Sequence, residues 1–165
     1  MTRSVLQKTA ESEGVIMEEK VKEAILNLSW NAPQCKQQEA IDFLSSVPED
    51  YYHFFLKENS KKGTWENVIE VIWRIPYPQK RLFIPDLLEH LQDINWPGAE
   101  EAIDLLTTFS KSDLTPFLEH SLTEAFIPKD GLWLAGLKLL VNEMGYVPSD
   151  FSDPIVFRYL GFADF

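Results

Sequence analysis

The block Glu39-Ala40-Ile41-Asp42-Phe43-Leu44 is the first of four similar six-residue segments in this chain. The other three begin at Asn67, Glu101 and Ala135, so that matching positions lie 28, 34 and 34 residues apart. These intervals are close to the period of helix–turn–helix repeats. In the first three copies a small or β-branched residue is followed by Ile, an acid and two apolar residues. The spacing therefore predicts a repeating helical array.

The acidic position of the block predicts which face of each helix meets solvent. Asp42, Glu70 and Asp104 occupy this position in the first three copies, beside apolar neighbours. An acid at a fixed place beside apolar residues is typical of an amphipathic helix that packs on one side. The fourth copy has Lys138 there instead. A terminal repeat is expected to be atypical because it caps the stack.

Apolar residues recur at helical spacing along most of the chain, and proline or glycine closes several of the stripes. The pattern predicts eight helices in four pairs, with the repeated block on the second helix of each pair. One helical hairpin cannot cover its own apolar face, whereas stacked hairpins bury a shared core. The predicted fold is therefore all-α, an α–α superhelix of about four HEAT-like helical hairpins. A plain eight-helix bundle is the alternative. The expected helices lie within 17–28, 40–47, 51–55, 65–75, 84–91, 99–109, 114–125 and 132–144, with a short ninth over 154–160.

Length and composition indicate one folded domain. The chain has 165 residues, of which 45% are hydrophobic and 13% aromatic, and this excludes wholesale disorder. Residues 1–14 are polar and are predicted to form a frayed leader before a single domain over 15–165. No apolar run approaches the roughly 18 residues that a membrane span needs. A cytoplasmic protein without a membrane partner is therefore expected.

The net charge restricts the class of partner. Twenty-six acids against fifteen bases give −11, and such a surface repels phosphate backbones. We therefore expect no nucleic-acid partner. A basic protein partner would suit this charge, although acidity that serves solubility alone is common. The basic pairs Lys61-Lys62 and Lys80-Arg81 are too few to form a phosphate-binding stripe and are expected on solvated faces.

No motif of a known enzyme class occurs in the sequence. Cys35 is the single cysteine, the three histidines lie far apart, and no glycine-rich phosphate loop or zinc-protease string is present. Glu89-His90 and Glu119-His120 are neighbours that point about 100° apart on a helix and do not pair. Each histidine is expected to close a solvent face. The sequence therefore predicts no catalytic residue, metal site or cofactor, and a protein that is not an enzyme.

The segment Leu91–Gly98 is the most unusual local string, and it reads as a tight helix–helix corner. Trp96 precedes proline and is predicted to be the N-cap, with Pro97 at the first helical position. Further on, Ser112-Asp113 is expected to cap a helix. Either the polar groups of the corner merely hold it together, or they contact a partner, since Trp is a common interface anchor. The candidate binding residues are Gln92, Asp93, Asn95 and Trp96.

Residues 82–141 resemble a bacterial domain family of unknown function with HEAT-like helical repeats. The family is associated with the string Leu-Gln-Asp-x-Asn-Trp-Pro, matched here by Leu91–Pro97, and with a downstream helix matched by Leu132-Trp133-Leu134. The match departs at His90, where an aromatic residue such as Trp is expected. The resemblance implies an α–α superhelix and supplies no catalytic residues. Some small bacterial proteins of this kind sit beside toxin or effector genes, which suggests an immunity-type or effector-partner role.

Two functional hypotheses follow. The first is a non-enzymatic protein-binding scaffold whose repeat face holds one partner. The second is a nucleobase-handling or DNA-binding HEAT-like enzyme, which would need a basic concave channel with a carboxylate or aromatic residue at its base. The net charge of −11 makes the second the weaker hypothesis. A purely structural role is also compatible with the sequence.

Overall fold

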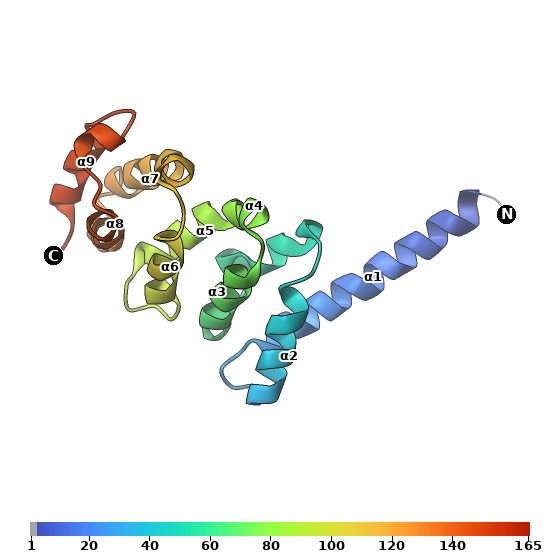
Figure 1. Ribbon diagram of the computed structural model, residues 1–165. Coiled ribbons are helices and arrows are strands. Elements are labelled where there is room, and N and C mark those ends of the chain that lie inside the picture. Colours follow the sequence, from blue (N-terminus) through green and yellow to red (C-terminus); the bar gives the residue numbers. More distant parts are fainter. Residues whose placement is uncertain (1–2) are drawn as a thin grey trace. The chain divides into compact units, whose positions relative to one another are not determined.

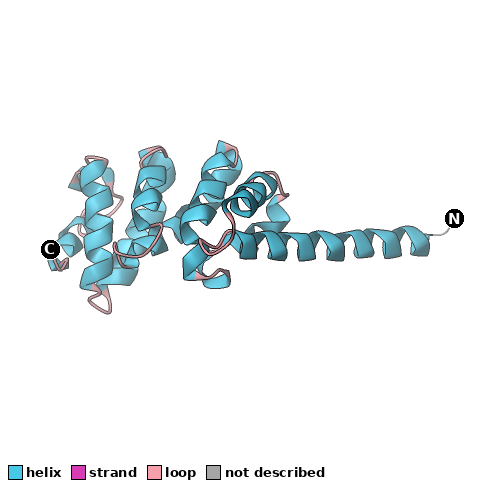
Figure 2. Cartoon of the chain, turned by 90° about the horizontal axis from the view of Figure 1, so that it is seen from below, coloured by secondary structure: helices cyan, strands magenta, loops and turns pink. Residues whose placement is uncertain are grey.

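The computed structural model describes residues 3–165 and the side chains from Leu6 onward (Figures 1 and 2). These residues form helices joined by turns and contain no strand. The prediction of an all-α chain built from helices packed against each other is confirmed. The chain divides into two compact units, Met1–Val71 and Ile72–Phe165, and each is described by itself.

The first unit is built on two long helices, α1 (Arg3–Asn27) and α2 (Gln34–Leu44), which pack against each other. Short 3-10 helices follow as η1 (Glu49–Phe55), η2 (Lys57–Asn59) and η3 (Lys62–Thr64) before α3 (Trp65–Arg74). Asn67 of α3 donates its side-chain amide to the Leu28 carbonyl at 2.7 Å and to Gln37 Oε1 at 2.8 Å. This one side chain therefore joins three segments of the unit. Its core includes Val21, Ala24, Ile25, Leu28, Ala40, Ile41, Leu44 and Phe55.

The predicted leader falls on the outer part of α1. Residues 3–14 form the first turns of this helix, and the side chains from Leu6 to Ile16 are exposed. The first buried side chain of the helix is Val21. Residues 1–2 of the leader lie outside the described residues. That the leader frays, and that 15–165 forms one domain, stay predictions.

The second unit contains the remaining helices. α4 (Tyr77–Lys80), η4 (Arg81–Phe83), α5 (Ile84–Glu89) and η5 (His90–Gln92) follow one another closely, and α6 (Ala99–Leu106) packs on α5. α7 (Lys111–Phe126) contacts α5 and α8 (Gly131–Glu143), and α8 also contacts η5. The chain continues through η6 (Pro148–Asp150), α9 (Val156–Tyr159) and η7 (Leu160–Phe162), where α9 packs on α7 and η7 on α8. Leucines dominate its core: Leu87, Leu88, Leu91, Leu105, Leu106, Leu114, Leu118, Leu122, Leu134, Leu137 and Leu140.

Each copy of the repeated block lies inside one helix, in α2, α3, α6 and α8. The acidic position is exposed at Asp42, Glu70 and Asp104, as the sequence predicted. Lys138, in the fourth copy, is half-buried and donates from Nζ to the Phe165 carbonyl at 3.1 Å. This copy differs because a later segment of the chain lies over its face. The second and last positions are buried in all four copies: Ala40 and Leu44, Val68 and Ile72, Ala102 and Leu106, Gly136 and Leu140.

Two predicted helix starts were wrong. α6 begins at Ala99 with Gly98 as its N-cap at φ 86°, rather than with Trp96 as the cap. The turn that contains Trp96 runs on for two residues before the helix begins. α7 begins at Lys111, and its cap is Ser110, whose Oγ accepts from the Asp113 backbone N–H at 3.2 Å. Both errors are shifts of two residues, because several polar residues near a helix start can serve as its cap.

Candidate functional site

The four predicted binding residues are neighbours at the corner between η5 and α6: Gln92 ends η5, and Asp93, Asn95 and Trp96 lie in the turn that follows. Asp93 leaves η5 in an extended conformation, and its Oδ1 accepts from the Asn95 backbone N–H at 2.9 Å and from Asn95 Nδ2 at 3.0 Å. The Asp93 carbonyl accepts from the Trp96 N–H at 2.9 Å. A side-chain carboxylate that bonds the backbone two residues later is an Asx turn. Asn95 is exposed, whereas Gln92, Asp93 and Trp96 are half-buried.

The turn enters α6 through Gly98. Its φ of 86° lies in the left-handed region, which glycine adopts without steric cost. The Trp96 carbonyl accepts from the Ala99 N–H at 3.1 Å, which closes the turn onto the helix. Glu100 and Glu101 occupy the first turn of α6, where the helix dipole favours negative charge. The corner therefore presents carboxylates immediately beside Trp96.

Helix α8 supports the corner from the other side of η5. Trp133 Nε1 donates to the Leu88 carbonyl at 3.0 Å, and this carbonyl belongs to the end of α5, where helical partners run out. A Cβ built on Gly136 would lie 2.1 Å from the Leu91 carbonyl oxygen. The backbone of α8 therefore lies directly against the end of η5, and only glycine fits there. These two contacts hold the base of the corner rigidly.

The corner lies in a stretch of sequence whose charged surface residues are acidic. Between Arg81 and Lys111 the sequence has no Lys or Arg. Glu100, Glu101 and Asp104 are exposed on α6, and Asp104 lies four positions after Glu100 and three after Glu101, so its side chain neighbours both. We call the following set the acidic corner: Gln92, Asp93, Asn95, Trp96, Glu100, Glu101 and Asp104. The overall charge of −11 hides this local pattern, but counting charges along the chain would have found the three α6 carboxylates.

The prediction that each histidine closes a solvent face is wrong for His90, although His120 is exposed. The His90 side chain is fully buried, and its Nε2 lies 3.6 Å from Oδ2 of Asp86, which is 8% exposed. α6 and α8 pack on η5 and cover the ring. A spacing of four places both residues on one helix face, and this signal could have found the pair. Because His90 is fully buried and Asp86 is only 8% exposed, the geometry of the pair indicates a structural role in the core.

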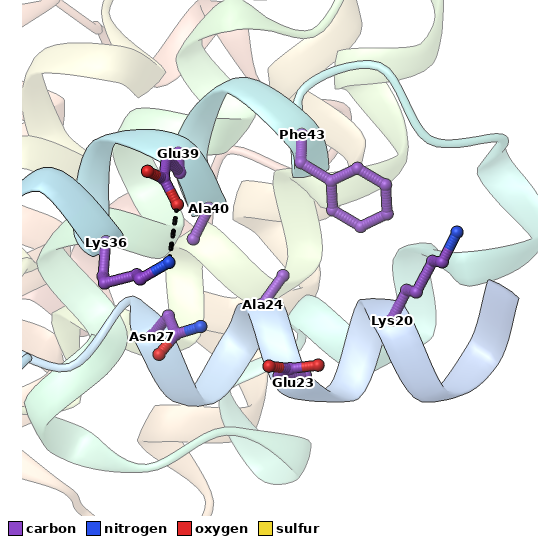
Figure 3. A pocket seen from close by; sticks show the side chains of 8 residues that line it. All are labelled: Lys20, Glu23, Ala24, Asn27, Lys36, Glu39, Ala40 and Phe43. Carbon is purple, nitrogen blue, oxygen red and sulfur yellow. Dashed lines mark hydrogen bonds and ion pairs between the residues drawn. The ribbon is translucent and has the colours of Figure 1, made fainter. Parts of the chain in front are cut away.

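The first unit has an open hollow of about 230 Å³ between α1 and α2 (Figure 3). Its charges alternate in sign, and Lys36 Nζ forms an ion pair with Glu39 Oε2 at 3.0 Å. Small side chains at Ala24 and Ala40 leave the space between the two helices. Because the positive and negative charges of the hollow cancel, it favours neither anionic nor cationic ligands, and we assign no function to it. Its lining residues are Lys20, Glu23, Ala24, Asn27, Lys36, Glu39, Ala40 and Phe43.

A more apolar hollow of about 360 Å³ lies in the second unit, beside the start of α7. Tyr77 donates its hydroxyl to Asp113 Oδ2, and Arg81 Nη1 donates to Asp113 Oδ1 at 3.1 Å. Hydrogen bonds from Tyr77, Ser110 and Arg81 hold the pKa of Asp113 below its ordinary value. The carboxylate is thus occupied within the chain and neutralises Arg81. The hollow is lined by Pro78, Arg81, Leu82, Ile84, Pro85, Asp113 and Phe117.

Two further classes of site were sought in the part of the chain that the structure describes. No three His, Cys, Asp or Glu side chains come together there as metal ligands would. None of the helices over residues 3–165 combines the length and the apolar character that crossing a membrane requires. Comparison with protein-family models, with curated proteins and with solved structures gave no match. The resemblance of residues 82–141 to a HEAT-like family therefore stays a prediction.

Proposed function

We propose that this protein is a cytoplasmic, non-enzymatic scaffold that binds a basic segment of a protein partner at the acidic corner. The observation that carries the proposal is the absence of Lys and Arg between Arg81 and Lys111, around a half-buried tryptophan. A partner segment that offers Lys or Arg side chains beside an apolar one would complement both features. An immunity-type or effector-partner role is one setting for such binding.

The proposed roles of the residues follow from their exposure. Trp96 would be the anchor, because burying the rest of a rigid aromatic ring gives a large contact area at low entropic cost. Glu100, Glu101 and Asp104 are exposed and would act at the rim of the interface. Charges at a rim mainly steer the encounter and select the partner. Binding should therefore weaken with added salt, since the Debye length is about 8 Å at physiological ionic strength.

Rigidity supports the same assignment. The Asp93–Asn95 hydrogen bonds and the contacts of Trp133 and Gly136 hold the corner in one conformation. A binding surface that is already ordered loses little side-chain and loop entropy when the partner arrives. The corner is therefore suited to binding without rearrangement.

Site-specific photocrosslinking tests the proposal. A benzoylphenylalanine placed at exposed Asn95 should capture a partner with a basic segment in cells of the source organism, and one placed at Glu124 should not. Both positions are exposed in the second unit. Capture of the same proteins from both positions would contradict a site at the corner.

Affinity for the purified partner is then compared between two charge-reversed variants. Glu100→Lys with Glu101→Lys should weaken binding by about tenfold or more and reduce its salt dependence. Glu124→Lys with Glu143→Lys makes the same change of charge at exposed positions of α7 and α8, and it should alter the affinity by less than about twofold. Equal losses for the two variants would mean that only net charge matters, and the proposed site would be wrong.

A further inference from the structure

Four tryptophans precede copies of the repeated block, and one of them differs from the others in exposure. Trp30, Trp65, Trp96 and Trp133 each lie two to nine residues before a copy of the repeated block. Trp65 is buried, and Trp96 and Trp133 are half-buried. Trp30 is 56% exposed. The first corner therefore carries the most exposed ring of this set, and packing within the first unit does not explain its place.

The Trp30 ring is nevertheless held in position. Its backbone N–H donates to the Gly63 carbonyl at 3.0 Å. A Cβ on Gly63 would lie 3.2 Å from Trp30 Cε2, so the ring rests on the backbone of this glycine. Leu26, one helical turn earlier on α1, is 62% exposed. Two large apolar side chains are thus presented to solvent on an ordered support.

Basic residues flank this apolar surface. Lys61 and Lys62 directly precede Gly63, on which the ring rests, and both are exposed. Lys61 also lines a hollow of about 300 Å³ together with Leu26. We call Leu26, Trp30, Lys61 and Lys62 the Trp30 patch. Its charge is opposite to that of the whole chain, which is −11.

The hollow beside the patch is poorly suited to a small anion. Three of its side-chain donors already bond backbone carbonyls: Ser60 Oγ that of Leu56 at 3.1 Å, Thr64 Oγ1 that of Lys61 at 2.6 Å, and Asn59 Nδ2 that of His53 at 2.8 Å. Phosphate sites normally supply several donors at once. Recognition of anionic membranes normally uses clusters of about 4–8 Lys or Arg side chains, whereas the patch has Lys61 and Lys62 alone. Charge complementarity on a local scale favours an acidic protein segment.

We propose that the Trp30 patch is a docking surface for an acidic protein segment that carries an apolar side chain. Trp30 and Leu26 would take the apolar group, Lys61 would pair with a flanking carboxylate, and the positive charge of Lys62 would add to the attraction. The patch belongs to the first unit and has the opposite charge to the acidic corner, so this inference does not depend on the proposed function.

Nuclear magnetic resonance of the full chain tests the docking surface directly. The five tryptophan indole N–H signals report five positions, and the Trp30→Phe variant identifies that of Trp30. The probe is the synthetic peptide acetyl-Glu-Asp-Leu-Glu-Glu-Phe-Asp-Glu-amide. It should shift the Trp30 signal saturably and leave the Trp96 signal in place. The same peptide with Lys in place of every acid should produce no saturable shift.

Variants test whether the peptide binds at the Trp30 patch rather than at the acidic corner. Lys61→Glu with Lys62→Glu should weaken peptide binding by about tenfold or more, whereas the matched change Lys8→Glu with Lys20→Glu on α1 should alter it by less than about twofold. Glu100→Lys with Glu101→Lys should not weaken it at all. Circular dichroism confirms that each variant is folded.

Several outcomes would overturn the inference. The inference is wrong if the Trp30 signal shows no saturable shift, or if the Lys peptide shifts it equally. It is also wrong if the two lysine variants lose the same affinity for the peptide. Binding of phosphatidylserine vesicles without a response to the acidic peptide would assign the patch to a membrane surface instead. Failure of this test would leave the acidic corner unaffected, because Trp96 and its partner are measured separately.

Discussion

The corner around Trp30 and the corner around Trp96 each precede a copy of the repeated block, yet they differ in packing and in charge. Trp96 is half-buried in a turn whose base is fixed by Trp133 and Gly136 of α8. Trp30 rests on Gly63 and is 56% exposed. The first corner carries lysines and the second carries carboxylates. The repeat thus determines where a corner occurs, and the segments packed around each corner determine which side chains are exposed there.

The largest losses of stability are expected at the buried leucines that follow both corners. Leu44 and Leu106 hold the last position of the block that follows each corner, and both are fully buried. Leu44→Ala and Leu106→Ala should each lower the free energy of unfolding by about 2–5 kcal/mol, because each leaves a cavity. Urea unfolding measures this loss. An unchanged stability in either variant would show that the two blocks are not equivalent.

The exposed acid of the same blocks supplies the control for these two substitutions. Asp42→Ala and Asp104→Ala change solvent-facing positions of α2 and α6. Each should alter the free energy of unfolding by less than about 1 kcal/mol. Losses as large as those of the leucine variants would contradict the assignment of these positions to the solvent face.

The next largest difference in stability is expected between alanine variants of the glycines that support the two corners. Gly136→Ala places a Cβ against the Leu91 carbonyl and should cost about 1–3 kcal/mol through overpacking. Gly63→Ala meets the Trp30 ring at 3.2 Å, and because this ring is exposed it can move aside, so a loss below about 1 kcal/mol is expected. Thermal unfolding compares the two, with Gly161→Ala as a control that meets no atom within 4 Å. Similar losses at Gly63 and Gly136 would mean that both corners are equally rigid.

Truncation of the tryptophans themselves should have a smaller effect. Trp96→Ala should lower stability by about 1–2 kcal/mol, since half-burial gives about half the loss of a fully buried ring. Trp30→Ala removes a mostly exposed ring and should cost less than about 1 kcal/mol. Chemical unfolding followed by circular dichroism measures both. A larger loss for Trp30 than for Trp96 would reverse the comparison and argue against Trp30 as a docking residue.

Acid should weaken the second unit, which contains the acidic corner, by a small amount. A hydrogen bond from the Val147 N–H and one from Lys111 lower the pKa of Asp150, and those from Tyr77, Ser110 and Arg81 lower that of Asp113. A lowered carboxyl pKa in the folded state gives stability that is present above the ordinary value near 3.8 and is lost as pH falls through the lowered value.

Melting temperatures between pH 7 and pH 2.5 test this expectation. Asp113→Asn with Asp150→Asn should be less stable than the native chain at pH 7 and should lose less on acidification below about pH 4. Glu124→Gln with Glu143→Gln removes two exposed carboxylates of the same unit as the control. Parallel pH curves for the native chain and the Asn variant would contradict the assignment.

Much of the fold could be predicted because its signals are local. Apolar spacing placed a helix or 3-10 helix within each expected range, although α1 begins at Arg3 rather than near Met17 and α2 ends at Leu44, before the expected end at Val47. The start of α6 was misplaced because a residue before proline often serves as the N-cap, which favoured Trp96. In the structure the Asx turn of Asp93 includes this region, and Gly98 is the N-cap instead. The four candidate binding residues do lie in one turn, and their role in binding stays a prediction.

Periodicity along the chain was sufficient to predict an all-α protein of packed helices, because side chains three or four positions apart share a helix face. How deeply each tryptophan is buried is decided by tertiary packing and could not be predicted from the pattern. Trp133 reaches the Leu88 carbonyl across 45 positions of sequence, and Trp30 meets Gly63 across 33. Contacts of this range leave no periodic trace, so the same residue type becomes a structural support at one corner and an exposed surface at another.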